Sequence, residues 1–368
     1  MKILIICRSF NNMAGGIERM AAALMNEMCA RGHEVSLLTW DLAGAKAFYE
    51  FDDRISWYNL DLGSHVNKAG FILRIKRMLK MRRLLKEIDP NIILAFQHGT
   101  FISSRIYSLG QGYPIISAER ESPSRFEHLK AGKWQWFIYQ SFRLARNITI
   151  QCESYRKEYP GYLHNKIVTI SNPVFPAKCF AKPIGEENGR NKLLSVGRLS
   201  YQKNHMALIK GFSKICYDFP NWDLVIAGEG EERKILEKEI KDLGLENRIS
   251  LLGAVKDTEE LYCNSHLLCL ASRWEGFPNV IAESLAHGLP VVGFSECGGM
   301  KDLIEDGVNG ILAKGNNNPE SLAQALSKLM AEDSYRGKMS KSAVKSMELY
   351  QPNKIFDRWE SFLTEASN

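Results

Sequence analysis

The 368-residue sequence contains no apolar run long enough to cross a bilayer. A membrane-spanning helix needs about 18 or more consecutive apolar residues, and the opening segment MKILIIC is too short and lacks the flanking residues of a secretory signal peptide. We therefore expect a cytoplasmic protein. The sequence also lacks an internal repeat and a low-complexity segment, which excludes a repeat architecture.

No two of the eight cysteines form a C-x-x-C pair, the spacing typical of zinc and redox sites. Several of them fall inside apolar, strand-like segments. We interpret all eight as reduced, buried, small apolar side chains, and expect neither disulfides nor zinc ligands. The eight are Cys7, Cys29, Cys152, Cys179, Cys216, Cys263, Cys269 and Cys297.

The dinucleotide fingerprint G-x-G-x-x-G is also absent, so a nicotinamide or flavin enzyme loses its main support. A hydrophobic content of 45% with 24% charged residues is typical of a globular protein. The chain is too long for one ordinary core and fits two domains of about 150 to 190 residues.

The net charge of +6 is unevenly distributed. Residues 1–185 hold 26 Lys and Arg against 15 Asp and Glu, a net charge of +11, whereas the remainder holds 22 against 27, a net charge of −5. An anionic partner would therefore meet the first half of the chain.

Both halves alternate strand-like and helix-like segments, the pattern of βα units. In the first half we expect strands at 2–7, 34–38, 54–62, 91–96, 114–118, 147–151 and 168–174, with helices at 17–31 and 71–88. In the second half we expect strands at 192–196, 222–227, 249–252, 266–271 and 290–294, with helices at 206–217, 231–243, 279–287 and 301–305.

The polar segment 176–191, rich in Pro and Gly, is the expected linker. The sequence thus predicts an α/β protein of two doubly wound, Rossmann-like domains that face each other across a cleft. The first covers residues 1–180, together with a C-terminal helix within 352–368, and the second covers residues 190–350.

Two glutamates, Glu275 and Glu283, flank the start of an expected helix. Pro278 suits the first helical position, because its missing N–H has no acceptor there anyway. Glu275 should therefore lie in the strand-to-helix loop and Glu283 more than one turn into the helix, roughly 12 Å away if the intervening residues are helical. That is about the span from the hexose to the ribose of a nucleotide sugar.

The first N–H groups of this helix, those of Asn279, Val280 and Ile281, are expected to lack acceptors within the helix. They would face outward at the positive end of the helix dipole, which suits a diphosphate. One segment can thus hold a sugar, a diphosphate and a ribose.

Two further loops carry groups that suit an anion. Arg198 and Lys203 lie five residues apart after the first strand of the second half, and can clamp a diphosphate through a bidentate guanidinium and a point charge. Gly15 and Gly16 open a helix after the first strand of the chain, where the backbone can approach a ligand closely. A solvated loop and a simple turn are the respective alternatives.

Together these segments resemble a family 4 glycosyltransferase, a retaining enzyme with two Rossmann-like domains in the GT-B architecture. The resemblance spans nearly the whole chain and rests on the order and spacing of residues 15–18, 197–203, 227–230, 275–283 and 306–310. Residues 118–123 further resemble the branch that adds Gal-, GalNAc- or GlcNAc-type sugars to lipid-linked or surface polysaccharides.

The resemblance implies a role for each candidate residue. Arg198 and Lys203 would neutralise the diphosphate leaving group, Glu283 would accept the ribose hydroxyls, and Glu275 would accept hydroxyls of the donor sugar. The donor site would be completed by main-chain amides near Gly16 and along the segment that contains Gly276, Phe277, Asn279 and Val280.

The resemblance also implies a mechanism without a cofactor. The cations and the helix dipole would replace a metal ion, and the sequence has no Asp-x-Asp pair. Retention would proceed by front-side attack, with the departing phosphate helping to deprotonate the acceptor hydroxyl. A hydrolase with paired carboxylates is the competing chemistry for two glutamates, but their positions direct Glu275 and Glu283 to opposite ends of one ligand.

Three residues of the first half are further candidates. His98 lies just after an expected strand, where the family often places an active-site histidine or polar residue, although Phe96 or Gln97 can align with that position equally well. An ordinary loop histidine is the alternative. Glu119 and Arg120, at the end of the next strand, are candidates for the acceptor side.

The expected helix 71–88 interleaves seven Lys and Arg residues with Ile, Leu and Met. Such a helix can lie in a lipid headgroup layer, or it can pack its apolar stripe inward and leave a solvated basic face. Residues 133–137, with two tryptophans near Arg143 and Arg146, favour the membrane.

We therefore expect transfer of a hexose or N-acetylhexosamine from a nucleotide sugar, of the UDP type, to a hydroxyl of a lipid-linked glycan. The reaction would take place at the inner face of the cytoplasmic membrane, with no nucleic-acid partner. Two alternatives remain open: a sugar-nucleotide epimerase or phosphorylase on the same fold, and a basic binding module without catalysis.

Overall fold

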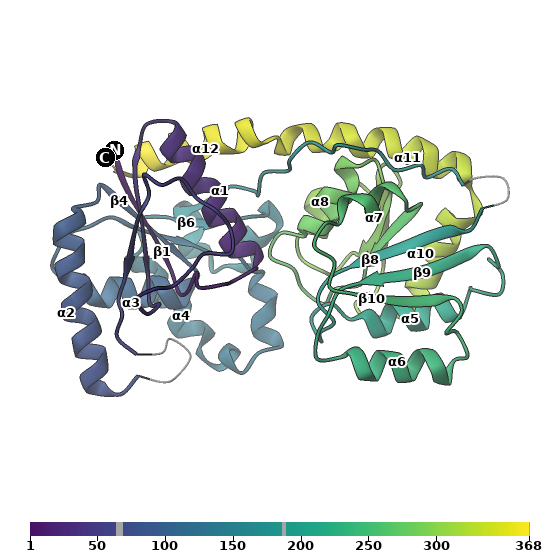
Figure 1. Cartoon of the computed structure of the whole chain (residues 1–368), viewed down its shortest axis with the longest axis horizontal. Helices are drawn as coiled ribbons and strands as arrows, with labels where there is room; N and C mark the ends of the chain where they lie inside the picture. Colours follow the sequence, from purple (N-terminus) through teal and green to yellow (C-terminus); the bar gives the residue numbers. More distant parts are fainter. Residues whose placement is uncertain (64–68, 186–188, 368) are drawn as a thin grey trace. The chain divides into compact units, whose positions relative to one another are not determined.

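The computed structural model describes residues 1–63, 69–185 and 189–367, which form two compact units (Figure 1). The first unit holds Met1–Gln151, Tyr155–Asn172 and the C-terminal residues from Asn353, and the second holds Cys152–Ser154 and Pro173–Pro352. The second unit thus begins before the expected boundary at 180–190. Residues 186–188 of the expected linker lie outside the described part of the chain.

A seven-stranded parallel sheet with the order β3-β2-β1-β4-β5-β6-β7 forms the first unit. Its inner strands are apolar, as is typical of parallel strands with helices on both faces; β4, for example, is buried at every position. The direction in which successive strands are added reverses between β1 and β4, so the loops that follow these two strands lie together. The strands are β1 (Lys2–Cys7), β2 (Glu34–Thr39), β3 (Ser56–Asn59), β4 (Ile92–Phe96), β5 (Ile115–Ala118), β6 (Ile148–Ile150) and β7 (Ile167–Thr169).

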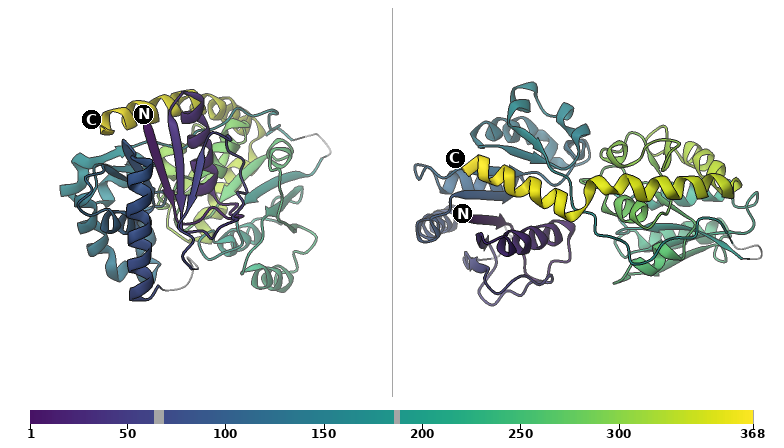
Figure 2. Two further views of the ribbon diagram at one scale, coloured as in Figure 1. Left: turned by 60° about the vertical axis from the view of Figure 1, so that its left-hand side comes forward. Right: turned by 90° about the horizontal axis from the view of Figure 1, so that it is seen from above.

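The helices of the first unit are α1 (Gly16–Ala30), α2 (Phe71–Ile88), α3 (His98–Tyr107), α4 (Gln135–Ser141) and α12 (Pro352–Ser367), with 3-10 turns η1 (Pro123–Glu127), η2 (Lys130–Trp134), η3 (Phe142–Leu144), η4 (Glu153–Glu158) and η5 (Gly161–Lys166). α12, drawn in yellow in Figure 2, packs with α1 on the sheet: Trp359 and Leu363 join Leu24 and Met25 in one buried cluster. The last helix therefore belongs to the core of the first unit.

The second unit has a six-stranded parallel sheet with the order β10-β9-β8-β11-β12-β13. The reversal falls between β8 and β11, which repeats the topology of the first unit. α5 and α6 lie on one side of β8–β10, and α7 and α8 lie on the other (Figure 1). The strands are β8 (Asn191–Val196), β9 (Trp222–Ala227), β10 (Ile249–Gly253), β11 (Leu267–Leu270), β12 (Val291–Phe294) and β13 (Gly310–Ala313).

The helices of the second unit are α5 (His205–Ser213), α6 (Arg233–Asp242), α7 (Glu259–Cys263), α8 (Asn279–Ala286), α9 (Met300–Leu303), α10 (Pro319–Ala331) and α11 (Asp333–Ser346), with η6 (Met347–Tyr350). Among the described residues, none of the helices of either unit combines the length and the apolar character of a membrane span.

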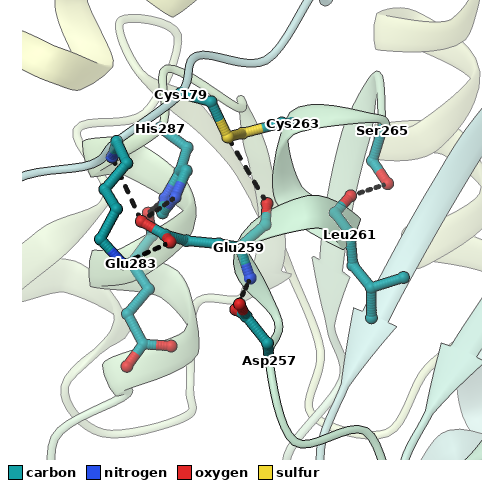
Figure 3. Close-up of a disulfide and its surroundings, with 9 residues drawn as sticks. Cys179, Asp257, Glu259, Leu261, Cys263, Ser265, Glu283 and His287 are labelled. Carbon is teal, nitrogen blue, oxygen red and sulfur yellow. Dashed lines mark hydrogen bonds and ion pairs between the residues drawn. A yellow bond between two sulfur atoms is a disulfide. The ribbon is translucent and has the colours of Figure 1, made fainter.

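The interpretation of the cysteines is wrong for one pair. Cys179 and Cys263 form a disulfide, with Cα atoms 6.0 Å apart (Figure 3). They are 84 residues apart in sequence, so only the fold brings them together and no spacing motif reveals them. The other six cysteines are buried thiols outside the disulfide, as expected.

Candidate active site

The carboxyl ends of β8 and β11 bring Lys203 and Glu275 together. These strands are neighbours in the sheet, so the loops that follow them lie side by side at the topological switch point. The Lys203 Nζ lies 2.6 Å from Glu275 Oε1, and Ser272 Oγ donates a hydrogen bond of 2.5 Å to the same oxygen. Glu275 is only 5% exposed, so its carboxylate is a buried group held by a positive partner.

Gly197 at the end of β8 makes room for the lysine. A Cβ at this position would lie 3.2 Å from Cδ and 3.3 Å from Cε of Lys203. Arg198 takes another direction: its side chain is 73% exposed, and its Nη2 lies 3.2 Å from Glu231 Oε2. The two cations expected to clamp a diphosphate thus pair with different carboxylates.

Helix α8 begins at Asn279, so Pro278 stands one position before the first helical residue. Glu283 lies in the second turn, and its Oε2 accepts a hydrogen bond of 2.9 Å from the hydroxyl of Tyr262 on α7. This tyrosine was not identified from the sequence, because a single tyrosine on a short helix carries no pattern. Its hydrogen bond orients the carboxylate of Glu283.

The expectation of three free N–H groups at the start of α8 is wrong for two of them. The N–H of Asn279 donates to the carbonyl of Phe277 at 2.7 Å, and the N–H of Ile281 donates to that of Pro278 at 2.9 Å. A tight turn at the proline supplies these acceptors. Within the described part of the chain, the N–H of Val280 has no acceptor.

Gly276 and Phe277 connect Glu275 to this helix. The thiol of Cys152 lies 3.6 Å from the carbonyl oxygen of Gly276, and the ring of Phe277 packs against Tyr350 with centroids 5.9 Å apart. The side chain of Phe277 is thus part of the core of the second unit. Only its main chain can serve a ligand.

His205, the first residue of α5, is a buried histidine at the same sheet edge that sequence reasoning did not identify. It is 1% exposed, and its Nδ1 lies 3.5 Å from Ser195 Oγ. Burial, together with the charge of Lys203, lowers the pKa of His205 to about 4. The imidazole is therefore neutral at pH 7.

In the first unit, Gly15 caps α1 and Gly16 is its first residue. A Cβ on Gly15 would collide with the carboxylate of Glu18, which folds back over the helix start. Burial raises the pKa of Glu18. An acidic side chain thus lies at the helix start whose N–H groups we expected near the donor.

His98 begins α3, where the sequence suggested a loop. Its Nδ1 accepts a hydrogen bond of 2.8 Å from Nη2 of Arg125, which places the ring proton on Nε2. Glu119 Oε2 lies 3.8 Å from the same Nδ1, and Glu119 Oε1 accepts a hydrogen bond of 2.9 Å from Ser117. Burial acts to raise the pKa of Glu119, but neighbouring groups, among them the charge of Arg125 and the hydrogen bond from Ser117, outweigh it and hold that pKa below its ordinary value.

Arg120 lies apart from this cluster. Its guanidinium is 5.0 Å from the ring centroid of Phe96 and 5.2 Å from that of Trp359, and the residue is 5% exposed. Its three guanidinium nitrogens have no hydrogen-bond partner among the described residues. Burial lowers the pKa of Arg120 to about 10. The structure thus joins His98 with Glu119, and places Arg120 in the interior of the first unit.

Solved structures of glycosyltransferases and related proteins share the fold of this chain. Sucrose-phosphate synthase from Thermosynechococcus elongatus superposes with a TM-score of 0.83 at 16% identity, over 99% of this chain and 98% of that chain. The Anabaena protein HepE, solved in complex with UDP and glucose, superposes with a TM-score of 0.77 at 18% identity, over 99% of both chains. The fold is that of a GT-B glycosyltransferase.

Family models cover both halves of the sequence. The model described as "Glycosyltransferase Family 4" matches residues 14–178, and that described as "Glycosyl transferases group 1" matches residues 179–346. The chain belongs to the family 4 glycosyltransferases.

A full-length relative comes from Campylobacter jejuni subsp. jejuni serotype O:2. It is named GalNAc-alpha-(1->4)-GalNAc-alpha-(1->3)-diNAcBac-PP-undecaprenol alpha-1,4-N-acetyl-D-galactosaminyltransferase. The two sequences are 26% identical over 375 residues, covering 100% of this chain and 99% of the relative.

Proposed function

We propose that the protein transfers a hexose or N-acetylhexosamine from a UDP-sugar to a hydroxyl of a lipid-linked glycan, with retention of configuration, in polysaccharide biosynthesis. The observation that carries this proposal is the Lys203–Glu275 pair at the switch point of the second sheet. Glu275 lies just before the start of α8, and Glu283 lies in the second turn of that helix. Ligands of doubly wound sheets bind at that point. The name of the Campylobacter relative supports a lipid-linked acceptor, and the UDP bound to HepE supports the nucleotide.

The second unit would contribute positive charge to the binding of the donor. Lys203, which pairs with Glu275, would also interact with the diphosphate of the donor. Among the residues that the structure describes, Arg198 pairs with Glu231 on the surface. Such an exposed ion pair contributes little stability and yields readily to a more highly charged ligand. Two cations at the diphosphate lower the barrier to its departure, and they do so without a metal ion.

The hydrogen-bonding groups would orient the donor. Glu283, held by Tyr262, would accept the ribose hydroxyls, and Glu275 would accept hydroxyls of the sugar. The N–H of Val280 would donate to the diphosphate between them.

The chemical step would occur on one face of the sugar. The acceptor oxygen bonds to the anomeric carbon on the face from which UDP departs, and the bond between that carbon and the phosphate oxygen breaks. The acceptor proton passes to a phosphate oxygen of the leaving UDP. His98 of the first unit, with its proton on Nε2, would donate a hydrogen bond to the sugar or the acceptor.

We also propose that the first unit lies on the inner face of the cytoplasmic membrane. Helix α2 buries Met81, Leu85 and Ile88 against the unit but leaves an apolar group exposed in its first half, beside basic side chains. That group is Phe71, Ile72, Ile75 and Leu79. Trp134 and Trp136, 62% and 63% exposed, are typical of residues at a membrane interface.

The substitution Glu283→Ala tests the proposed site. We expect UDP release that requires a lipid-linked acceptor in the native protein, and a rate at least 100-fold lower in the variant, with an unchanged circular dichroism spectrum. Glu246→Ala, which removes an exposed carboxylate of the same unit, is the matched control. Near-normal turnover in Glu283→Ala would refute the site. Absence of acceptor-dependent UDP release in the native protein would instead favour an epimerase or phosphorylase.

A further inference from the structure

Three side chains of the types that bind transition metals lie close together in the second unit, next to the proposed donor site (Figure 3). Cys179 lies in the segment that follows Pro173, Cys263 ends α7, and His287 directly follows α8. Their ligand atoms, the two Sγ atoms and one imidazole nitrogen, all lie within 4.8 Å of one another. In the structure the two sulfur atoms are joined as a disulfide.

The imidazole of His287 is oriented toward the two cysteines. The residue is 5% exposed, and its Nδ1 lies 2.7 Å from the carbonyl oxygen of Glu283, so Nδ1 carries the proton and donates it. The lone pair therefore belongs to Nε2, which is buried and has no hydrogen-bond partner among the described residues. A buried acceptor without a donor is unfavourable. A histidine that binds a metal through Nε2 typically donates its Nδ1 proton to a carbonyl, and His287 has this arrangement.

We propose that Cys179, Cys263 and His287 bind a Zn²⁺ ion when the disulfide is reduced, with Glu259 as the fourth ligand. Tetrahedral zinc with bonds of about 2.3 Å to sulfur and about 2.0 Å to nitrogen sets its ligand atoms about 3.5 to 3.8 Å apart. The separations here, within 4.8 Å, allow that geometry. Once the S–S bond is broken, rotation about the Cα–Cβ bonds of the cysteines separates the sulfurs enough to admit the ion.

Glu259 suits the fourth position. Its Oε1 lies 3.9 Å from His287 Nε2, and its Oε2 lies 3.0 Å from Lys178 Nζ. Two thiolates and one carboxylate around a divalent ion leave one net negative charge, which the lysine balances. Thiolate and imidazole ligands favour zinc over magnesium or calcium.

Two chemical steps connect the disulfide to the metal-bound form. A dithiol reductant transfers two electrons and two protons to the S–S bond and is itself oxidised to a disulfide. Zn²⁺ then displaces both thiol protons, which pass to solvent, and forms two metal–sulfur bonds. The bound ion would hold α7, which carries Tyr262, against α8, which carries Glu283.

Cobalt titration of the full-length protein tests this site. The chain is reduced until a thiol assay under denaturing conditions finds all eight thiols, stripped with a chelator, and titrated with Co²⁺ without oxygen. We expect one equivalent to bind with a thiolate-to-cobalt absorption band, which Zn²⁺ abolishes by displacement. The oxidised chain, in which the disulfide leaves six thiols, should show no such band.

Substitutions separate this site from adventitious binding. Cys263→Ser should remove most of the band, and His287→Gln should weaken Co²⁺ binding at least tenfold. Cys216→Ser, which removes a buried free thiol elsewhere in the unit, should change neither. A fully reduced chain without a thiolate band, or equal band intensity and affinity in His287→Gln, would overturn the proposal. Neither result would bear on glycosyl transfer.

Discussion

At the scale of single residues, Lys203 and Glu275 form an ion pair in which each charge stabilises the other. The carboxylate is buried, so removal of the lysine alone leaves a negative charge that water cannot reach. Stability and catalysis are therefore coupled in this pair, and a single substitution affects both.

A double substitution separates the two effects. Lys203→Met should lower the free energy of unfolding by about 3 kcal/mol, and addition of Glu275→Gln should recover most of that loss, because the buried charge is gone. Activity should stay at least 100-fold down in both variants. Urea unfolding and acceptor-dependent UDP release measure the two quantities. Recovered activity in the double variant would contradict the roles assigned to the pair.

His205 makes stability depend on pH. Its folded pKa of about 4 lies below the ordinary histidine value of about 6.5, so between these values the unfolded chain binds a proton that the folded chain does not. Stability should therefore fall as pH falls from 6.5 to 4. His205→Gln should remove on the order of 3 kcal/mol of that pH dependence, measured by urea unfolding at a series of pH values. Parallel pH profiles for the two proteins would show that His205 does not titrate this way.

At this scale the sequence predicts candidate residues but not their contacts. Lys203 and Glu275 were predicted because each lies in a loop after a strand, and His98 because the family resemblance places a histidine or polar residue near that position. The partner of His98, Arg125, has no spacing relation to it and is brought near only by the turn η1. The burial of Arg120 between Phe96 and Trp359 depends on the last helix of the chain. The sequence predicts that helix but not the side chains that it contacts.

At the scale of elements, helix α2 packs against the first unit along its second half and exposes apolar side chains along its first half. The sequence left open whether its apolar stripe faces the protein or a membrane, and the structure divides the stripe between its two ends. The second half packs inward through Met81 and Leu85, whereas Phe71 and Ile72 are 78% and 71% exposed.

Binding to anionic lipid vesicles tests the proposed membrane role of α2. Each cation near an anionic surface contributes about 1 kcal/mol, so Arg74→Gln with Lys76→Gln should weaken binding roughly thirtyfold. Lys234→Gln with Lys238→Gln on α6 removes the same charge from the other unit and should have little effect. Vesicle sedimentation measures both variants. Equal losses in the two would indicate that only total charge matters, and would contradict a role specific to α2.

Strands and helices were not equally predictable. β1 and β9 have the expected bounds, because apolar runs between turn residues identify buried parallel strands. Helix α10 was not predicted although its signals are present: Asn318 caps it, and Pro319 is its first residue. Helix α3 lacks such signals, since no side chain caps it and it begins after Gln97 at φ 70°.

At the scale of the whole molecule, both units share one topology, with the strand order reversing beside the first strand of each sheet. The alternation of strands and helices predicted two such domains. It did not predict where one unit ends, because Cys152–Ser154 and residues 173–180 lie in segments without periodicity and pack with the second unit. Repeated topology gives each unit its own loop cluster at the carboxyl ends of its strands.

The anomeric configuration of the product, followed by NMR during one turnover, tests the central claim most directly. With an α-linked UDP-sugar and a polyprenyl-diphosphate-linked glycan, the account predicts an α-linked product and one UDP released for each sugar transferred. A β-linked product, or free sugar released in place of a glycosylated lipid, would contradict it.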